Sequence, residues 1–305
     1  WISMDLKSKI ILISGPTASG KSKFALKLAK KINGEIINAD SMQIYKECKI
    51  LSARPSKKDQ TEIKHHLYGF QSVKKNFSTG QWINLCLKKI QEIKKKNKVP
   101  IVVGGTGLYF KSLVCGIAKI PSIPLSFRNN IIKTQKKIGQ KNFYNKLIKI
   151  DPLVKKKISL NDINRSIRAY EVKKKTKISI YEWQKKTKKF FKDEDFLKIY
   201  FDYSKKDLEK KINKRVDKML KIGAIKEARK ILNLKLNKLK SANYIIGIKE
   251  IDEYINNKIP NKTILKDRII LRTMRYVKRQ LTWSRGNMQE WKKLKSSDFE
   301  RFFNL

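Results

Sequence analysis

The stretch GPTASGKS, from Gly15 to Ser22, carries the residue types that bind a polyphosphate. It satisfies G-x-x-x-x-G-K-[ST], in which backbone N–H groups surround an anion, the lysine reaches phosphate oxygens and the hydroxyl ligates Mg²⁺. The apolar run KIILIS precedes it and the helical pattern KFALKLAKKI follows, which is the context that this motif requires. We therefore expect a diphosphate- or nucleotide-binding loop made of Gly15, Pro16, Thr17, Ala18, Ser19, Gly20, Lys21 and Ser22. Ser22 is the expected ligand of a Mg²⁺ cofactor.

An acidic partner for this loop is less obvious. An enzyme that hydrolyses or phosphorylates with a nucleotide needs a carboxylate after another core strand. The run VPIVVGG ends instead in GGTGLYF, which contains no carboxylate. Asp40, in ADSMQIYK, follows a different predicted strand, whose C-terminal end should lie over the phosphate loop. Position alone leaves Asp40 as a metal ligand, a general base or a cap on the following helix.

The positive charge indicates a polyanionic partner, although weakly. The net charge is +47 and the pI about 10.2, and such a balance favours phosphate contacts. Most of the excess is lysine in a chain rich in isoleucine and asparagine, a composition that A/T-rich coding also produces. The 12 arginines are more informative, because arginine offers a planar, bidentate fork, and five of them lie between Arg268 and Arg285.

This arginine-rich stretch predicts a two-faced helix. Its basic positions recur at i, i+4, i+7 and i+11, and its apolar positions hold the same spacing about half a turn away. The basic positions are Arg268, Arg272, Arg275 and Arg279, and the apolar positions are Ile270, Met274, Val277 and Leu281. We expect one buried face and one face that presents arginines, with generic amphipathicity as the alternative.

Strands that alternate with helices predict an α/β fold with a P-loop NTPase-like, doubly wound parallel sheet. The expected strands are KIILIS, EIINAD, VPIVVGG and LKIYFDYS, and Gly34 is expected to end the helix after the phosphate loop. Between them, KIPSIP opens a stretch without strand patterns. We predict that residues 1–118 form the first part of the core and 119–194 a helical insertion domain. Residues 195–305 would complete the core and continue as C-terminal helices, since the chain after Ser204 looks helical to its end.

Several classes of protein are disfavoured. Three scattered cysteines and two adjacent histidines do not suit a disulfide framework or a zinc site. The sequence has neither the apolar run of about 20 residues that a membrane helix needs nor a signal-type N-terminus. We therefore expect a cytoplasmic protein without a membrane partner.

Six blocks together resemble one family, the bacterial tRNA dimethylallyltransferases. They are GPTASGKS, ADSMQIYK, HHLYGF, VVGGTGLYFKSL, NDINRSIRAYEV and KRQLTWSRG, in this order from about Ile10 to Arg285. The resemblance implies transfer of a dimethylallyl group from dimethylallyl diphosphate to the N6 amine of adenine 37, next to the anticodon, in tRNAs reading codons that begin with U. It implies two partners, dimethylallyl diphosphate and the tRNA anticodon stem-loop, and we expect a monomer.

The resemblance also implies residue roles. Asp40 matches the family's base, Thr106 matches a threonine beside the reaction centre, and Arg128 matches an arginine that reaches from the inserted domain towards the diphosphate. From position alone, a turn residue and a solvated surface arginine are the alternatives for the last two. The implied tRNA-binding residues are Asp40, Ser41, Met42, Gln43, Asn164, Arg165, Ser166, Ile167, Arg168, Arg272, Arg275, Lys278, Arg279, Gln280, Trp283 and Arg285. The flipped adenine would enter a tunnel opposite the allylic diphosphate.

Some features leave alternatives open. Trp283 is a base-stacking residue or a core residue, and Ser41 and Gln43 also suit a polar helix start. Gly69 departs from the family, which usually has an aspartate there. The rival functions are an isopentenyltransferase acting on free adenine nucleotides, a P-loop nucleotide kinase, and a nucleic-acid-binding protein with a vestigial loop. The helical additions disfavour the first, the missing carboxylate the second and the intact loop the third.

Overall fold

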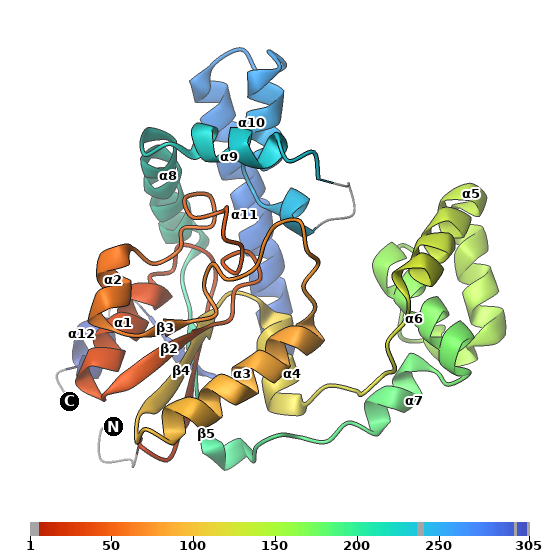
Figure 1. The fold of residues 1–305 in the computed structure, drawn as a ribbon, viewed down its shortest axis with the longest axis horizontal. Helices are drawn as coiled ribbons and strands as arrows, with labels where there is room; N and C mark the ends of the chain where they lie inside the picture. Colours follow the sequence, from red (N-terminus) through yellow and green to blue (C-terminus); the bar gives the residue numbers. More distant parts are fainter. Residues whose placement is uncertain (1–5, 237–240, 296–297, 304–305) are drawn as a thin grey trace. The chain divides into compact units, whose positions relative to one another are not determined.

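The fold comes from a computed structural model that describes residues 6–236, 241–295 and 298–303. The chain divides into two compact units. The core unit is Trp1–Ser112 with Phe191–Leu305, and the helical unit is Leu113–Phe190. Each unit is described separately below (Figure 1).

A parallel sheet forms the centre of the core unit, as the alternating pattern predicts. Its strands are β1 (Ile10–Ser14), β2 (Gly34–Asn38), β3 (His65–His66), β4 (Val99–Gly104), β5 (Phe196–Phe201) and β6 (Lys292–Leu294). Their order across the sheet is β3-β2-β4-β1-β5-β6, and every described pairing is parallel. Every residue of β1 and β4 is buried, as expected for central strands covered on both faces.

The direction of the crossovers places the site. The helices between the first strands are α1 (Lys21–Lys31), α2 (Lys57–Glu62) and α3 (Thr79–Lys94), and α4 (Gly107–Cys115) follows β4. The chain crosses the sheet in one direction from β1 to β2, and in the opposite direction from β3 to β4 and from β4 to β5. Because crossovers are right-handed, α1 (between β1 and β2) and α3 (between β3 and β4) cover opposite faces, which confirms the doubly wound fold. The carboxyl ends of β1 and β4 therefore border the crevice where such sheets bind ligands.

Several local expectations were wrong. β2 ends at Asn38 and not at Asp40, because the chain turns there. Asn33, with φ 53°, takes the left-handed position after α1, and Gly34 instead begins β2. Gly34 lies so close to β4 that a Cβ atom would come within 2.7 Å of the Ile101 side chain. The expected all-helical C-terminal region contains β6, a lysine-rich edge strand that no apolar pattern reveals.

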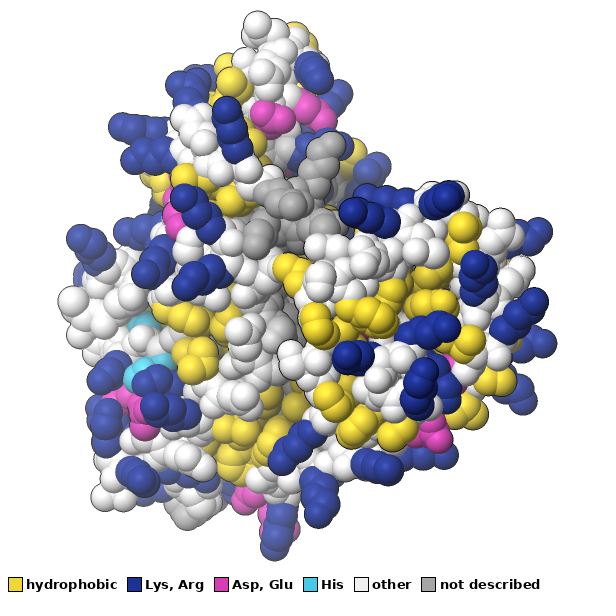
Figure 2. All heavy atoms as spheres, turned by 45° about the vertical axis from the view of Figure 1, so that its right-hand side comes forward, with side chains coloured by type: hydrophobic (Ala, Val, Ile, Leu, Met, Phe, Trp, Pro, Cys, Tyr) yellow, Lys and Arg dark blue, Asp and Glu magenta, His cyan; other side chains and the backbone are white. Residues whose placement is uncertain are grey.

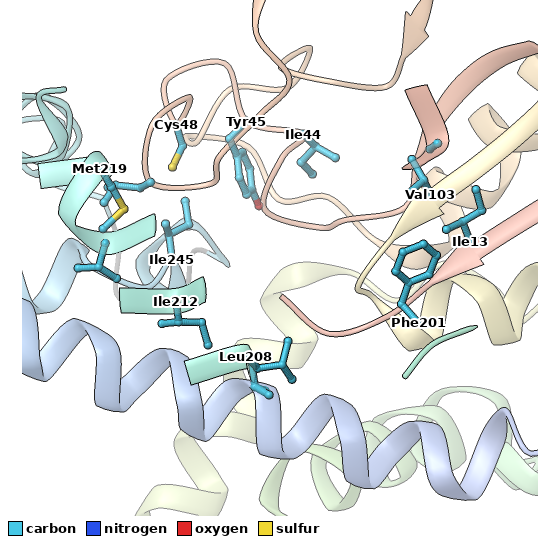
Figure 3. Close-up of a cluster of buried hydrophobic side chains, with 14 of the residues drawn as sticks. Ile13, Ile44, Tyr45, Cys48, Val103, Phe201, Leu208, Ile212, Met219 and Ile245 are labelled. Atoms are coloured by element: carbon cyan, nitrogen blue, oxygen red, sulfur yellow. The ribbon is translucent and has the colours of Figure 1, made fainter. Parts of the chain in front are cut away.

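Five further helices complete the core unit. They are α8 (Lys205–Lys221), α9 (Ala224–Leu232), α10 (Ile248–Ile255), α11 (Lys262–Asn287) and α12 (Asp298–Phe303). Figure 3 shows Leu208, Ile212 and Met219 along α8, between α11 and the loop that carries Tyr45 and Cys48. These side chains are buried in the same apolar core as the sheet residues.

Helix α11 buries a slightly different face from the one expected. Its fully buried positions include Leu265, Ile269, Thr273 and Val277, spaced four apart. The expected residues Ile270, Met274 and Leu281 are only partly buried, although they pack against the same core. The buried face of α11 is therefore rotated towards the arginines, and the two faces are less than half a turn apart.

Within residues 113–190, all of which are described, the chain forms helices and no strand. They are α5 (Leu125–Ile150), which breaks at Gly139 with φ 76°, then α6 (Ile163–Thr176) and α7 (Ile180–Lys185). Buried Ile131, Phe143 and Ile167 join α5 to α6. Among the described residues of both units, every helix is too short or too polar to cross a bilayer.

Candidate active site

The phosphate loop joins β1 to α1 and is held by close backbone packing. A Cβ atom on Gly15 would come within 2.6 Å of Phe201 Cβ in β5, so only glycine fits there. Gly20 caps α1 with φ 87°, a left-handed conformation that glycine adopts without strain. Lys21 donates a hydrogen bond from Nζ to the Pro16 carbonyl at 3.1 Å, which folds its side chain back over the loop. The Ser19 hydroxyl is buried and finds no hydrogen-bond partner in the described part of the chain.

The protonation of Lys21 depends on whether an anion is bound. Burial lowers the pKa of Lys21 from about 10.5 to about 8, Asp40 opposes this shift, and Arg215 adds to it. A bound diphosphate would favour the charged form. Binding above pH 8 then requires proton uptake, because the free amine is neutral there.

We therefore predict that affinity for an alkyl diphosphate falls as the pH rises through 8, by up to about tenfold per pH unit. The ligand's own last ionisation lies near pH 6, well below this window. Calorimetric titrations between pH 7 and 9.5, in buffers of different ionisation enthalpy, measure affinity and proton uptake together. A flat profile would contradict this role of Lys21, and Lys21→Met should remove the dependence.

Asp40 lies in a turn that the preceding residues hold firmly. The Asn38 side chain accepts the Asp40 N–H at 2.9 Å and donates to the Asp40 carbonyl at 3.0 Å and to Leu67 O at 2.9 Å. Asp40 Oδ1 accepts the Met42 N–H at 2.9 Å and so closes a turn. Residues 41–56 form no helix, so the alternative of a cap on a following helix is wrong. Among the described residues, no hydrogen bond reaches Oδ2. One oxygen therefore holds the turn, and the other is free to accept a proton.

Thr106 lies beside this turn because hydrogen bonds join the loop after β4 to the loop after β2. Its N–H donates to Ala39 O at 3.1 Å, and its Oγ1 accepts the Ser41 N–H at 2.9 Å and donates to Ser41 Oγ at 3.3 Å. Gly104 permits the approach, since a Cβ there would lie 2.1 Å from the Ala39 backbone. The structure thus brings together Asp40, Ser41 and Thr106, as the sequence predicts.

Two cavities meet at Asp40. The smaller, of about 110 Å³, is lined by the phosphate loop and includes Lys21, Ser22 and Gly104. The larger, of about 230 Å³, is mainly apolar and includes Met42, Val216 and Met219. Four residues border both cavities: Thr17, Asp40, Ser52 and Arg215. A molecule with an anionic head and an apolar tail can therefore place the bond between them next to Asp40.

Arg215 is a site residue that sequence reasoning missed. It lies in α8 beside the buried residues Ile212 and Val216 and borders both cavities. Burial lowers its pKa and the nearby Asp40 opposes this, so the guanidinium and carboxylate interact across the site. A usable signal existed, because Arg215 is the only arginine of the lysine-rich helix α8.

Three tyrosines lie near Asp40. Burial, with a smaller effect of Asp40, raises the pKa of Tyr68, Tyr109 and Tyr276 far above the ordinary value. Their hydroxyls therefore stay protonated and can donate hydrogen bonds at any physiological pH.

The donors present suit Mg²⁺ only together with a ligand. In the described residues, no three His, Cys, Asp or Glu side chains gather as a metal site. The Ser22 hydroxyl nevertheless lines the small cavity. Magnesium commonly binds one or two protein oxygens and completes its shell with phosphate oxygens and water, so this hydroxyl fits it.

Comparison with known proteins identifies the family. The model of the family described as IPP transferase matches residues 43–287. The tRNA dimethylallyltransferase of Pelagibacter ubique (strain HTCC1062) is 56% identical over 291 residues, covering 95% of this chain and 93% of the relative. The chain belongs to the IPP transferase family.

Other members of the IPP transferase family agree in sequence and fold. The tRNA dimethylallyltransferase of Rickettsia massiliae (strain Mtu5) is 42% identical, covering 97% of this chain and 82% of its own length. A crystal structure of the tRNA isopentenylpyrophosphate transferase of Bacillus halodurans is 29% identical and aligns with a TM-score of 0.69, over 97% and 95% of the two chains. A eukaryotic dimethylallyltransferase acting on tRNA aligns with a TM-score of 0.83 at 27% identity, over 96% and 75%.

Gly69, where this IPP transferase departs from the pattern expected, has a local explanation. Its φ is 55°, and a Cβ atom would overlap the Arg54 guanidinium. Arg54 donates to the carbonyls of Tyr45 and Lys46 and so holds the loop after Asp40. An aspartate at 69 would need this arginine to move.

The implied site residues of the helical unit, catalytic Arg128 and the tRNA-binding residues 164–168, separate into two groups. The Arg128 and Arg168 guanidiniums both reach Glu171 Oε1, at 3.3 and 2.5 Å, and Glu171 is fully buried. Asn164 and Arg165, which are exposed on the surface of α6, belong to the same group. By contrast, Ser166 and Ile167 are buried, so their side chains face the unit's interior and not a bound RNA.

The implied tRNA residues of α11 also differ from one another. Arg272 Nη1 pairs with the nearly buried Glu250 at 2.7 Å, and Arg268 pairs with Glu253. Four residues are exposed and form no ion pair within the described part of the chain: Arg275, Lys278, Arg279 and Arg285. Half-buried Trp283 packs on Gly107, and Gln280 and Gln43 bond to backbone groups. Figure 2 shows Lys and Arg side chains scattered among hydrophobic and other side chains, so charge alone does not mark an interface.

The contrast between paired Arg272 and Arg279, which forms no ion pair among the described residues, gives two opposite predictions for helix α11 of this IPP transferase. Arg279→Ala should weaken binding of an anticodon stem-loop and reduce the slope of log K against log salt by about 0.9, because a free phosphate contact is lost. Arg272→Ala should leave that slope nearly unchanged and lower the stability by about 1–3 kcal/mol, since Glu250 Oε1 loses the Arg272 guanidinium. Filter binding across salt concentrations and thermal unfolding measure both. Equal slopes in wild type and Arg279→Ala would contradict the assignment.

Proposed function

We propose that the protein transfers the dimethylallyl group from dimethylallyl diphosphate to N6 of adenine 37 in tRNAs that read codons beginning with U, with release of diphosphate. The observation that carries this proposal is the junction of the two cavities at Asp40. One side offers an anion site and the other an apolar space, which matches an allylic diphosphate. Family membership supports the same reaction.

The proposed step forms the N6–C1 bond and breaks the C1–O bond to diphosphate. The adenine amine is a poor nucleophile, because its lone pair is delocalised into the ring. Asp40 Oδ2 accepts one N6 proton as the bond forms, while Oδ1 keeps its bond to the Met42 N–H. Asn38 and Thr106 hold this turn in place.

The leaving group takes the bonding electrons and gains negative charge. Lys21, Arg215 and the N–H groups of the phosphate loop stabilise that charge. Mg²⁺, held by Ser22 and by diphosphate oxygens, would supply further charge neutralisation when bound. Arg128, which pairs with Glu171 inside the helical unit, is kept as a proposed catalytic residue because it matches the family's arginine.

The remaining assignments complete the proposal. The helical insertion, predicted as 119–194, and the C-terminal helices would bind the anticodon stem-loop of the tRNA. We expect Asn164, Arg165, Arg168, Arg275, Lys278, Arg279 and Arg285 to supply the phosphate contacts. We propose that the protein acts as a monomer in the cytoplasm.

A direct assay tests the proposed function. The protein is incubated with Mg²⁺, dimethylallyl diphosphate and either an anticodon stem-loop or AMP, and nucleosides are analysed by mass. We expect adenosine in the stem-loop to gain C5H8 while AMP stays unmodified. Modified AMP with unmodified RNA would favour action on free nucleotides. ATP turnover without prenylation would favour a kinase. The stretch GGTGLYF, at the end of β4 and after it, contains no carboxylate, which already argues against a kinase.

A further inference from the structure

Gln280 makes two hydrogen bonds that its place among arginines does not predict. Its Oε1 accepts the Thr17 N–H at 3.0 Å, and its Nε2 donates to Gly105 O at 3.0 Å. Thr17 lies in the phosphate loop, and Gly105 follows β4. One side chain of α11 therefore joins the two loops that border the ligand crevice.

The next turn of α11 strengthens this attachment. The Trp283 ring lies so close to Gly107 that a Cβ atom there would come within 2.3 Å of it. Ser284 Oγ donates to the Tyr200 hydroxyl of β5 at 2.9 Å. The helix thus contacts the carboxyl ends of three strands with one side. Exposed Lys278 and Arg279 lie on the same turns.

We propose that Gln280 is a positioning residue that fixes the phosphate loop and couples RNA binding on α11 to diphosphate binding. The inference rests on the proposed function only for the identity of the two ligands. Oε1 and Nε2 of Gln280 are each engaged by the two loops, so the amide group is turned towards them and holds them together. Without it, the Thr17 N–H loses its acceptor, and diphosphate binding must order a looser loop.

Binding measurements with Gln280→Met test the proposal, because methionine keeps the length but removes both hydrogen bonds. We expect affinity for an unreactive dimethylallyl diphosphate analogue to fall about tenfold. Affinity for the stem-loop alone should change less than twofold. The factor by which the stem-loop tightens analogue binding should fall towards one.

The controls separate positioning from general damage. Thr282→Ala, at an exposed position two residues on, should leave both affinities and the coupling factor unchanged, and thermal unfolding checks that Gln280→Met is folded. Loss of stem-loop affinity with unchanged analogue affinity would overturn the proposal and make Gln280 an RNA contact. An unchanged coupling factor would also overturn it.

A second pair of variants tests the path through Gly105. A Cβ atom on Gly105 would lie 2.5 Å from Gln280 Nε2, and every other neighbouring residue is at least 3.6 Å away. Gly105→Ala should therefore weaken analogue binding by displacing Gln280, and add almost nothing when Gln280→Ala is already present. Additive losses would overturn the proposal. Because binding needs no turnover, these results remain decisive even if prenylation of RNA fails.

Discussion

Replacing Asp40 with asparagine is expected to slow the chemical step by about 10²–10⁴-fold while leaving RNA affinity nearly unchanged. Asparagine keeps an oxygen that can accept the Met42 N–H, so the turn after β2 stays closed. What it lacks is the negative charge that takes the proton from N6. Single-turnover transfer to a saturating stem-loop measures this step without product release.

The companion variant Asp40→Ala separates chemistry from structure. It removes both the base and the bond that closes the turn, so it should lose as much activity as asparagine and some stability as well. Loss of the acceptor of the Met42 N–H costs about 1 kcal/mol. If asparagine retained full single-turnover activity while alanine did not, Asp40 would hold the turn and not act as a base.

Replacing Lys21 with methionine is expected to lower kcat/KM for dimethylallyl diphosphate by about 10²–10³-fold. The lysine is the charged side chain of the phosphate loop, and the leaving group is most negative in the transition state. The loss should therefore appear in kcat as well as in KM. Steady-state rates over a range of dimethylallyl diphosphate concentrations distinguish the two.

A neighbouring lysine provides the control. Lys23, two residues on, is exposed, and Lys23→Met removes the same charge from the same helix. It should change kcat/KM by less than a few fold, because solvent screens its charge. Equal losses in both variants would mean that net charge, and not the position of Lys21, supports the reaction.

The phosphate loop was accessible to sequence reasoning because its elements are local. An apolar strand, a glycine-rich turn and a helix start stand within 22 residues, and each depends mainly on its own residues. Asp40 followed from a second strand of the same parallel sheet. The strand boundaries were less certain, because Asn33 can replace glycine at a helix end and Asn38 ends β2 early.

The sequence by itself determined the fold class, the phosphate loop, Asp40 and the family, since these rest on local patterns and on blocks in a fixed order. Only the tertiary structure revealed that Arg215 borders both cavities, that Arg272 is neutralised by Glu250, and that Gln280 bonds to two loops. Each of these facts joins residues far apart in the chain. Residue type and helical spacing say which side chains share a face, but the partner of each one is decided by how distant elements pack.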